Sequence, residues 1–315
     1  MPGIVDVHHH IMLPEFLAIQ EARIRRTGYW GEKLTQWTPQ WSIEEMDKNG
    51  AAVSILSISA PGSWTGKIDE SRKLARTLND YKAQIVRDHP GRFGFFATIP
   101  LPDVEGSLAE IVYACDVLKA DGICLLTNYD SKYPGDPAFA PVYDELNRRK
   151  AIVYSHPAAV DCCVNMVPGV PMAILEFMFD NTRAIVSLLQ NGTFARCPDI
   201  KFIFSHCGGA LSGVAGRVNG WSRAFADKAP GGALAALKKL AFDTASMNNP
   251  ATFAAMFQLA GPKNIMFGSD FPWGTIAASK DPLRALGLSA EDLHNIEEGN
   301  ARRMFARLKP DGGQA

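Results

Sequence analysis

Three consecutive histidines, His8, His9 and His10, follow a short and mostly apolar run at residues 4–7. A run of this kind is typical of a buried strand. Because successive side chains of a strand point to opposite faces, His8 and His10 face one way and His9 the other. Neutral imidazole is the commonest ligand for zinc-like ions, so the pair predicts half of a metal site. An expression tag or a solvated polar cluster is the alternative, but the triplet continues a hydrophobic strand without a linker.

Three further reactive groups also fall at the ends of apolar runs. His156 follows the run 151–155, His206 follows 200–205, and Asp270 follows 264–268. In a barrel of alternating strands and helices, active sites are assembled at the C-terminal ends of the strands. We therefore expect all of these groups at one mouth of a barrel, although a hydrogen-bonded core histidine is the alternative for His156 and for His206.

The elements that must position these residues alternate along the whole chain. Eight apolar, β-branched runs separated by helical segments predict an α/β fold, a (β/α)8 TIM-type barrel, as a single domain over residues 1–315. We expect strand ends near residues 10, 59, 100, 127, 156, 206, 244 and 270, and C-terminal helices within 281–308. No GxGxxG follows the first strand and no GxxxxGK[ST] occurs, so dinucleotide and P-loop chemistry have no support.

The segment 15–41 is unusually long for a connection and carries Tyr29, Trp30, Trp37 and Trp41. It is too aromatic for a solvated linker, so we expect an irregular, aromatic-rich insertion after strand 1 that folds over something. Ser42 begins a Ser-Ile-Glu-Glu sequence, which predicts a capping box and the start of the next helix.

The charge and composition of the chain limit which classes of binding partner and which cellular location we expect. The chain has 32 basic and 33 acidic residues and a net charge of −1, which does not favour binding to nucleic acid or to an anionic membrane. It has neither an apolar run of membrane-spanning length nor a signal peptide, so we expect a cytoplasmic protein. Six cysteines without CxxC pairs predict reduced thiols, at positions 115, 124, 162, 163, 197 and 207.

Five short motifs occur in a fixed order: DVHHH at 6–10, YSHP at 154–157, FSHCGG at 204–209, FGSDFP at 267–272 and GNAR at 299–302. Together they resemble the amidohydrolase superfamily, and in particular its branch of aminocarboxymuconate-semialdehyde and 6-methylsalicylate decarboxylases. The resemblance implies one divalent ion held by His8, His10, His156 and Asp270, with His206 beside it as an acid/base group. It also implies a homodimer.

Three imidazoles and one carboxylate suit Zn²⁺, with Mn²⁺ as the alternative. Members of this superfamily with two metals generally use a lysine at the end of strand four as a carboxylated bridge. The corresponding run 122–128 contains no lysine, and Lys132 lies beyond it. We therefore expect a single ion.

The surroundings of the site predict the substrate. Trp64, Phe179, Trp273 and the Met- and Phe-rich section 158–180 suit a planar apolar molecule, although ordinary core packing explains that section equally well. The glycines after His206 are expected to leave room for it. Arg217, eleven residues beyond His206, matches a substrate-carboxylate arginine of the resembling enzymes, and a helix-surface charge is its equal alternative.

Those enzymes use a second arginine that has no clear counterpart in this chain, so the resemblance favours a monocarboxylate. We expect a non-oxidative decarboxylase, with His206 and Asp270 as catalytic groups, of a hydroxylated aromatic (salicylate-type) or related unsaturated acid. A metal-dependent hydrolase of a carbon–carbon, ester or lactone bond is the alternative, because both reactions use the same ligands.

Overall fold

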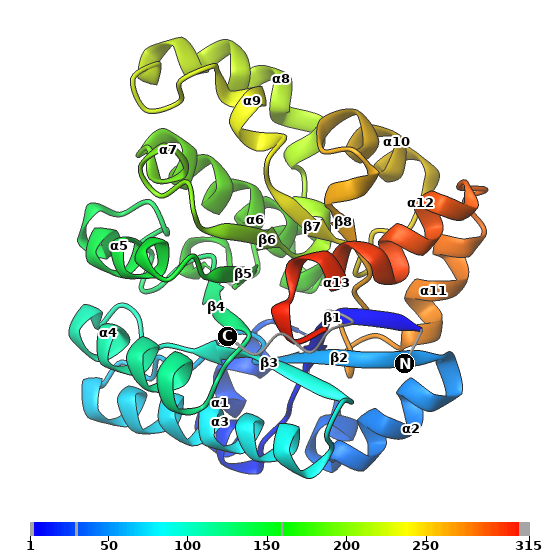
Figure 1. Ribbon diagram of the computed structural model, residues 1–315. Helices are drawn as coiled ribbons and strands as arrows, with labels where there is room; N and C mark the ends of the chain where they lie inside the picture. Colours follow the sequence, from blue (N-terminus) through cyan, green and yellow to red (C-terminus); the bar gives the residue numbers. More distant parts are fainter. Residues whose placement is uncertain (1–2, 29–30, 159, 309–315) are drawn as a thin grey trace.

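The computed structural model describes residues 3–28, 31–158 and 160–308. Eight parallel strands follow one another in sequence order around a barrel (Figure 1). Val7 N donates to Phe267 O at 3.0 Å and His10 N to Phe271 O at 2.7 Å, so β1 lies beside the end of β8. The predicted (β/α)8 barrel is confirmed, with strands β1 Ile4–His10, β2 Ala51–Ser57, β3 Phe93–Thr98, β4 Gly122–Leu126, β5 Ile152–His156, β6 Lys201–Phe204, β7 Ala241–Asp243 and β8 Ile265–Met266.

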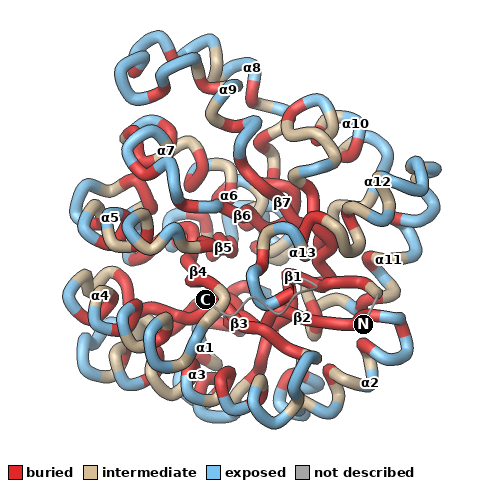
Figure 2. The backbone as a smooth tube through the Cα atoms, viewed as in Figure 1, coloured by how far each residue is buried: buried red, intermediate tan, exposed pale blue. Residues whose placement is uncertain are grey.

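Helices fill the connections and surround the strands (Figure 1). They are α1 Pro14–Arg26, α2 Pro39–Asn49, α3 Ile68–Asp88, α4 Val104–Val112, α5 Ala140–Arg148, α6 Met172–Gln190, α7 Thr193–Arg196, α8 Leu211–Trp221, α9 Ala233–Leu237, α10 Pro250–Leu259, α11 Ile276–Arg284, α12 Ala290–His294 and α13 Asn300–Met304. The strands are buried and the outer faces of the helices are exposed (Figure 2), as a barrel core covered by amphipathic helices requires.

Strand β1 carries one extra residue between Asp6 and His9. Asp6 pairs with Ser54 and His9 pairs with Leu56, so three steps along β1 match two steps along β2. Such a bulge bends the strand and redirects side chains, and bulges are frequent beside active sites. His8 and His10 nevertheless lie on the same side, as the strand alternation predicts.

The irregular insertion expected at 15–41 is not confirmed. Residues 14–26 form the regular helix α1, with Pro14 in its first turn and a buried face made by Phe16, Leu17, Gln20 and Ile24. The buried residues recur at helical spacing, which the high aromatic content of the segment does not prevent. Of those aromatics, Tyr29 and Trp30 lie outside the described residues.

The helix expected to begin at Ser42 begins three residues earlier. Pro39 occupies the first turn of α2, and the Thr38 hydroxyl accepts a hydrogen bond from Trp41 N at 3.1 Å. Proline suits the first helical position because its missing N–H has no intrahelical partner there. Ser42 lies inside the helix and is fully buried, so the predicted capping box is wrong.

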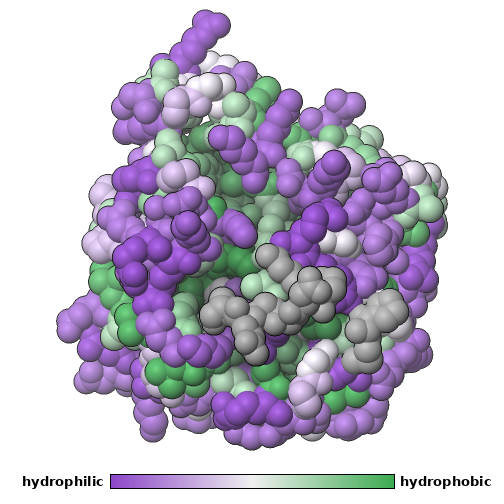
Figure 3. All heavy atoms as spheres, viewed as in Figure 1, coloured by the Kyte–Doolittle hydropathy of each residue, from purple (hydrophilic) through white to green (hydrophobic). Residues whose placement is uncertain are grey.

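The face in Figure 3 is largely hydrophilic, with smaller hydrophobic areas in a central hollow and along the rim. Among the described residues, no helix is long and apolar enough to cross a membrane.

Lys82 of α3 is fully buried beside β3. Its Nζ donates to Phe96 O at 2.6 Å and to Thr98 Oγ1 at 3.0 Å. Burial lowers the pKa of Lys82 to about 7, because the charged amine is poorly solvated there.

We expect the stability of a Lys82→Met variant, relative to wild type, to depend on pH. Between pH 7 and pH 10.5, Lys82 is protonated in the unfolded chain but neutral in the folded protein. The cost of burying a charged amine therefore lowers the stability of the wild-type protein fully below pH 7, and this cost disappears towards pH 10.5. The variant's relative free energy of unfolding should therefore fall across this window, by on the order of 4 kcal/mol. Urea denaturation at pH 6.5 and pH 10 measures it.

The matched control is Lys73→Met on the exposed side of the same helix. Its stability relative to wild type should not change with pH. An equal pH dependence in the two variants would contradict the burial argument.

Candidate metal centre

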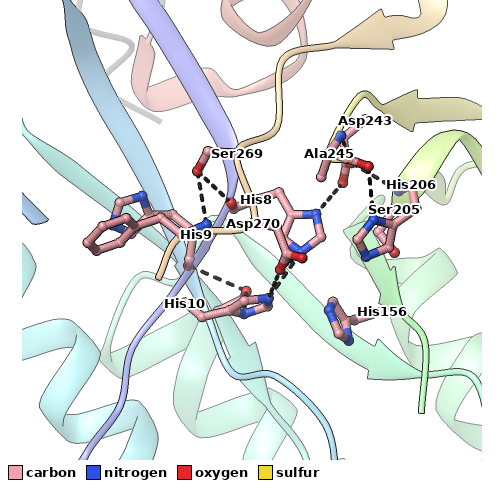
Figure 4. A network of polar contacts seen from close by, with 12 residues as sticks. His8, His9, His10, His156, Ser205, His206, Asp243, Ala245, Ser269 and Asp270 are labelled. Carbon is pink, nitrogen blue, oxygen red and sulfur yellow. Dashed lines mark hydrogen bonds and ion pairs between the residues drawn. The ribbon is translucent and has the colours of Figure 1, made fainter. Parts of the chain in front are cut away.

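Four predicted ligands converge at one mouth of the barrel (Figure 4). His8, His10, His156 and Asp270 each offer one ligand atom, and these atoms all lie within 4.8 Å of one another. Nε2 of His8 is 3.0 Å from Nε2 of His10, and Oδ1 of Asp270 lies 3.1 Å and 3.2 Å from these two nitrogens. The group could hold one metal ion.

The hydrogen bonds of the rings place their protons away from the centre. His156 Nδ1 donates to Pro157 O at 2.8 Å, and His206 Nδ1 donates to Ala245 O at 2.9 Å. A carbonyl oxygen can only accept, so in each neutral ring the proton is on Nδ1 and Nε2 carries a lone pair.

His8 and His10 have the same arrangement. His8 Nδ1 donates to Asp243 Oδ2 at 3.0 Å, and His10 Nδ1 lies 2.9 Å from Ser57 Oγ. Ser57 Oγ also donates towards His9 O at 3.5 Å, which leaves its lone pair for the His10 proton.

With both rings neutral, as metal ligation requires, two Nε2 lone pairs face each other at 3.0 Å, next to an Asp270 Oδ1 atom that is buried and has no hydrogen-bond partner among the described residues. Facing lone pairs and an unpaired carboxylate oxygen repel one another unless a cation lies among them. The donor set thus fits a divalent metal.

The pKa values agree with this interpretation. Burial lowers the pKa of His10 to about 4 and that of His156 well below its ordinary value, so both rings are neutral, as ligation requires. Burial alone would also lower the pKa of His8, but the carboxylates of Asp243 and Asp270 raise it to about 10. The place between these carboxylates therefore favours positive charge.

Both carboxylates are ionised at neutral pH. Burial would raise the pKa of Asp270, but the adjacent imidazoles of His8 and His10 hold it well below its ordinary value. The pKa of Asp243 is likewise lowered, because His8 and His206 outweigh its burial. Each is an acceptor or ligand in the resting protein.

His206 follows β6 and stands outside the four-residue group. Its ring centroid is 4.9 Å from that of His8 and 5.8 Å from that of His156. Burial lowers its pKa, so its Nε2 lone pair is free to take up a proton at neutral pH. The position suits a group that exchanges protons with a molecule in the cavity.

The mouth contains a cavity of about 280 Å³. Asp270, His156 and His206 reach it, and most of its remaining wall is apolar. No arginine or lysine is among its lining residues within the described chain, which are Ile24, Thr27, Ser59, Ala60, His156, Ala173, Ile174, Phe177, Met178, His206, Ser246, Met247, Asp270 and Trp273. A ligand in this cavity would contact polar groups at one end and neutral, mostly apolar side chains along the rest of the wall.

Of the substrate contacts expected from the sequence, the structure brings only Trp273 to this cavity. Trp64 lines a neighbouring, smaller pocket, where its Nε1 donates to Asp130 Oδ2 at 2.8 Å. Phe179 is 46% exposed, because Phe177 and Met178 of α6 take the inward positions.

Arg217 also lies away from the cavity. Leu211 and Ala215 form the buried side of α8, four residues apart, and Arg217 is exposed on another side of this helix. The structure therefore does not bring its guanidinium to a ligand in the cavity of the same chain.

The glycines after His206 serve packing rather than substrate access. A Cβ on Gly209 would overlap Met178 O, and one on Gly208 would lie 2.8 Å from the Phe242 ring. Both have positive φ, which glycine adopts without strain. The expectation that they leave room for a substrate is wrong, because α6 and β7 occupy that room.

Several polar residues around the ligands are held by hydrogen bonds that the sequence pattern does not predict. His9, on the other side of β1, contacts Asp6 Oδ2 through Nδ1 at 3.0 Å and Ser42 Oγ through Nε2 at 2.9 Å. Asp6 also accepts from Ser269 N at 3.0 Å, directly before Asp270. Asp243, the last residue of β7, contacts His8 Nδ1 at 3.0 Å, and a carboxylate at a barrel strand end is a signal that the sequence offers.

The comparisons with known proteins agree with this geometry. The chain is 33% identical to the decarboxylase yanB of Aspergillus niger, over 97% of this chain and 87% of that protein. It is also 33% identical to the 6-methylsalicylic acid decarboxylase of Penicillium expansum, over 97% of each.

Among solved structures, it matches the 5-carboxyvanillate decarboxylase of Novosphingobium aromaticivorans, complexed with manganese and 4-hydroxy-3-methoxy-5-nitrobenzoic acid. The TM-score is 0.87 at 21% identity, over 96% of both chains, which shows a shared fold. The family model described as amidohydrolase matches residues 5–307. The chain belongs to the amidohydrolase family.

Proposed function

We propose that this protein is a metal-dependent, non-oxidative decarboxylase of a hydroxylated aromatic acid of the salicylate type. The observation that carries the proposal is the cavity itself, which combines the four-residue ligand group and His206 with an apolar wall. The names of the relatives, including a 6-methylsalicylic acid decarboxylase, support the same reaction.

The wall of the cavity favours a monocarboxylate. Within the described chain it offers no lysine or arginine, so a second carboxylate on the substrate would be desolvated without a counter-charge. Aromatic and aliphatic side chains such as Trp273, Phe177 and Ile174 suit a planar ring with an apolar substituent.

His8, His10, His156 and Asp270 would hold the ion. A bound divalent cation supplies positive charge that stabilises an ionised phenolic oxygen and orients the substrate. We propose Zn²⁺ on affinity, because such donor sets bind it more tightly than Mn²⁺. Mn²⁺ is the competing outcome, because the matched 5-carboxyvanillate decarboxylase structure contains manganese. Elemental analysis of the purified protein decides between them.

The residues of this chain move one proton. His206 Nε2 or the carboxylate of Asp270 takes the phenolic proton and delivers it to the ring carbon that bears the carboxylate. The bond to the carboxylate then breaks, carbon dioxide leaves, and the electron pair restores the aromatic ring. The resulting phenolate takes a proton from solvent, so the net change is replacement of carbon dioxide by a proton.

Product analysis tests this function. With 6-methylsalicylate and related hydroxybenzoates, we expect equal amounts of carbon dioxide and of the decarboxylated phenol. A hydrolase of the same barrel would instead release products that contain water oxygen and no carbon dioxide. Absence of carbon dioxide across the panel, with metal-loaded protein, would reject the proposal.

Asp270→Asn should separate metal binding from turnover. Asparagine keeps the shape and one oxygen ligand but cannot carry a proton, so we expect partly retained metal and a kcat lowered by about two or more orders of magnitude. Metal content and kcat are measured on one preparation. Asp281→Asn, whose side chain is 69% exposed, is the control. Near-normal turnover in Asp270→Asn would refute the catalytic role.

We further propose a homodimer. Apolar side chains are exposed along 166–179 near the cavity, with Met166 at 61% and Ile174 at 54%. Exposed apolar patches of this kind commonly mark interfaces. Light scattering should give the mass of two chains, and Phe179→Glu should lower it, whereas Val117→Glu on exposed surface elsewhere should not. A monomeric wild-type protein would reject the dimer.

A further inference from the structure

Asp243 ends β7 and is completely buried beside the ligand group (Figure 4). Its Oδ2 accepts from His8 Nδ1 at 3.0 Å and from the Tyr154 hydroxyl at 2.9 Å. Its Oδ1 accepts from the backbone N–H groups of His206 and Ala245, each at 3.0 Å. One carboxylate therefore contacts both a proposed metal ligand and the proposed acid/base residue.

We infer that Asp243 is a positioning residue that fixes the ring tautomer of His8 and, at the same time, the conformation of His206. The inference rests on the proposed metal site. The single buried side chain of Asp243 would then couple metal binding at His8 to the orientation of His206, the proton-exchanging group.

The first part concerns His8. A histidine that binds a metal through Nε2 must keep its ring proton on Nδ1, and an acceptor at Nδ1 holds it there. Asp243 Oδ2 is that acceptor, while the Tyr154 hydroxyl fixes the carboxylate from another side. Without the acceptor, the proton of a neutral ring is free to move to Nε2 and block the ligand position.

The second part concerns His206, whose φ of 50° is in the left-handed region that non-glycine residues seldom adopt. Its backbone N–H is held by Asp243 Oδ1. The same oxygen holds Ala245 N, and Ala245 O accepts the ring proton of His206 at 2.9 Å. Asp243 thus orients the ring of His206 through Ala245.

The packing leaves Asp243 little freedom to move. A Cβ on Gly268 would lie 2.9 Å from both Cγ and Oδ1 of Asp243. The backbone of the segment that leads to Asp270 therefore presses directly against the carboxylate, and only glycine permits this approach.

Asp243→Asn gives a sharp test, because the orientation of the amide is forced. The amide oxygen must face the two backbone N–H groups, since its NH₂ group would meet them donor to donor. The NH₂ group then faces His8 Nδ1, which can only accept by losing its proton to Nε2. The side chain keeps its size, yet the lone pair of His8 is turned away from the ligand group.

We expect Asp243→Asn to weaken Zn²⁺ and Mn²⁺ binding about 10- to 100-fold, the range for losing such a supporting contact. Equilibrium dialysis against chelator-buffered Zn²⁺ and Mn²⁺ measures this without reference to activity. Tyr154→Phe, which removes one hydrogen bond but leaves the carboxylate, should stay within about threefold of wild type. Circular dichroism confirms that each variant is folded.

Unchanged affinity in Asp243→Asn would overturn the inference, and so would an equal loss in Tyr154→Phe. Should Asp243→Asn not fold, nitrogen-15 NMR of the zinc-loaded wild-type protein decides. A ring proton on Nδ1 of both His8 and His206 supports the assignment, and a proton on Nε2 of His8 overturns it. A wild-type protein that binds neither ion fails earlier, at the proposed metal site, and removes this role with it.

Discussion

Replacing both ligands on β1 in a His8→Ala, His10→Ala variant is expected to abolish metal binding and turnover together. The wild-type protein should hold about one ion per chain, because four ligands complete one accessible site. The double variant loses the two nitrogens that lie 3.0 Å apart and retains only His156 and Asp270 of the group. Elemental analysis and carbon dioxide release, measured on the same preparation, give the result.

His9→Gln is the matched control from the same strand. His9 contacts Asp6 and Ser42 and stacks on Phe271 with ring centroids 4.7 Å apart, on the side away from the ligands. This variant should keep its metal and its kcat but lose about 1–3 kcal/mol of stability, through weakened buried hydrogen bonds. Full metal occupancy in a folded His8→Ala, His10→Ala protein would refute the ligand assignment.

The barrel was predictable because its signals are local. Each parallel strand is buried on both faces and reads as a short apolar run, and amphipathic helices lie between such runs. The position of reactive residues was predictable for a related reason. Within a barrel, the strand ends are where polar side chains from several strands come together at one mouth. His156 satisfies this rule directly, at the last position of β5.

Strand ends alone do not fix the whole site. Asp270 lies four residues beyond the end of β8 at Met266, and it reaches the ligand group because the following segment pairs with β1. Its backbone N–H donates to His8 O at 2.9 Å. The sequence predicts Asp270 at this mouth of the barrel. It does not predict the backbone hydrogen bond between β1 and the segment after β8, on which the position of Asp270 depends.

The cavity wall was less predictable than the ligands. Its lining depends on which way each helical residue points, and a one-residue step turns a side chain by about 100° around the axis. Met178 faces the cavity and Phe179 faces solvent for this reason. Ile24 of α1 and Thr27, which follows this helix, belong to the same wall, and the aromatic-rich pattern of the segment does not predict that helix.

Supporting residues were the hardest to predict. Ser57 and Asp243 lie on β2 and β7, far from His10 and His8 in the sequence, and each contacts its ligand through a single hydrogen bond. A serine or aspartate at a strand end is compatible with many roles. Only the distances between strands show which ring nitrogen each of them contacts.

His206→Asn should retain the metal and lower kcat by about two to four orders of magnitude, the range for losing a positioned acid/base group. The four groups that could hold an ion do not include His206, so metal content should stay near one ion per chain, as in wild type. Asparagine is the suitable replacement because it tolerates the positive φ of 50° at this position. Metal content, melting temperature and kcat on one preparation separate a catalytic role from a structural one.

His294→Asn, whose side chain is 65% exposed, serves as the control and should match wild type in all three measurements. If His206 were only a core histidine, the variant would melt at a lower temperature while the folded fraction kept its specific activity. If His206 were a fifth ligand, metal would be lost from a folded protein. Either result would contradict the assignment of His206 as an acid/base group outside the four-residue ligand group.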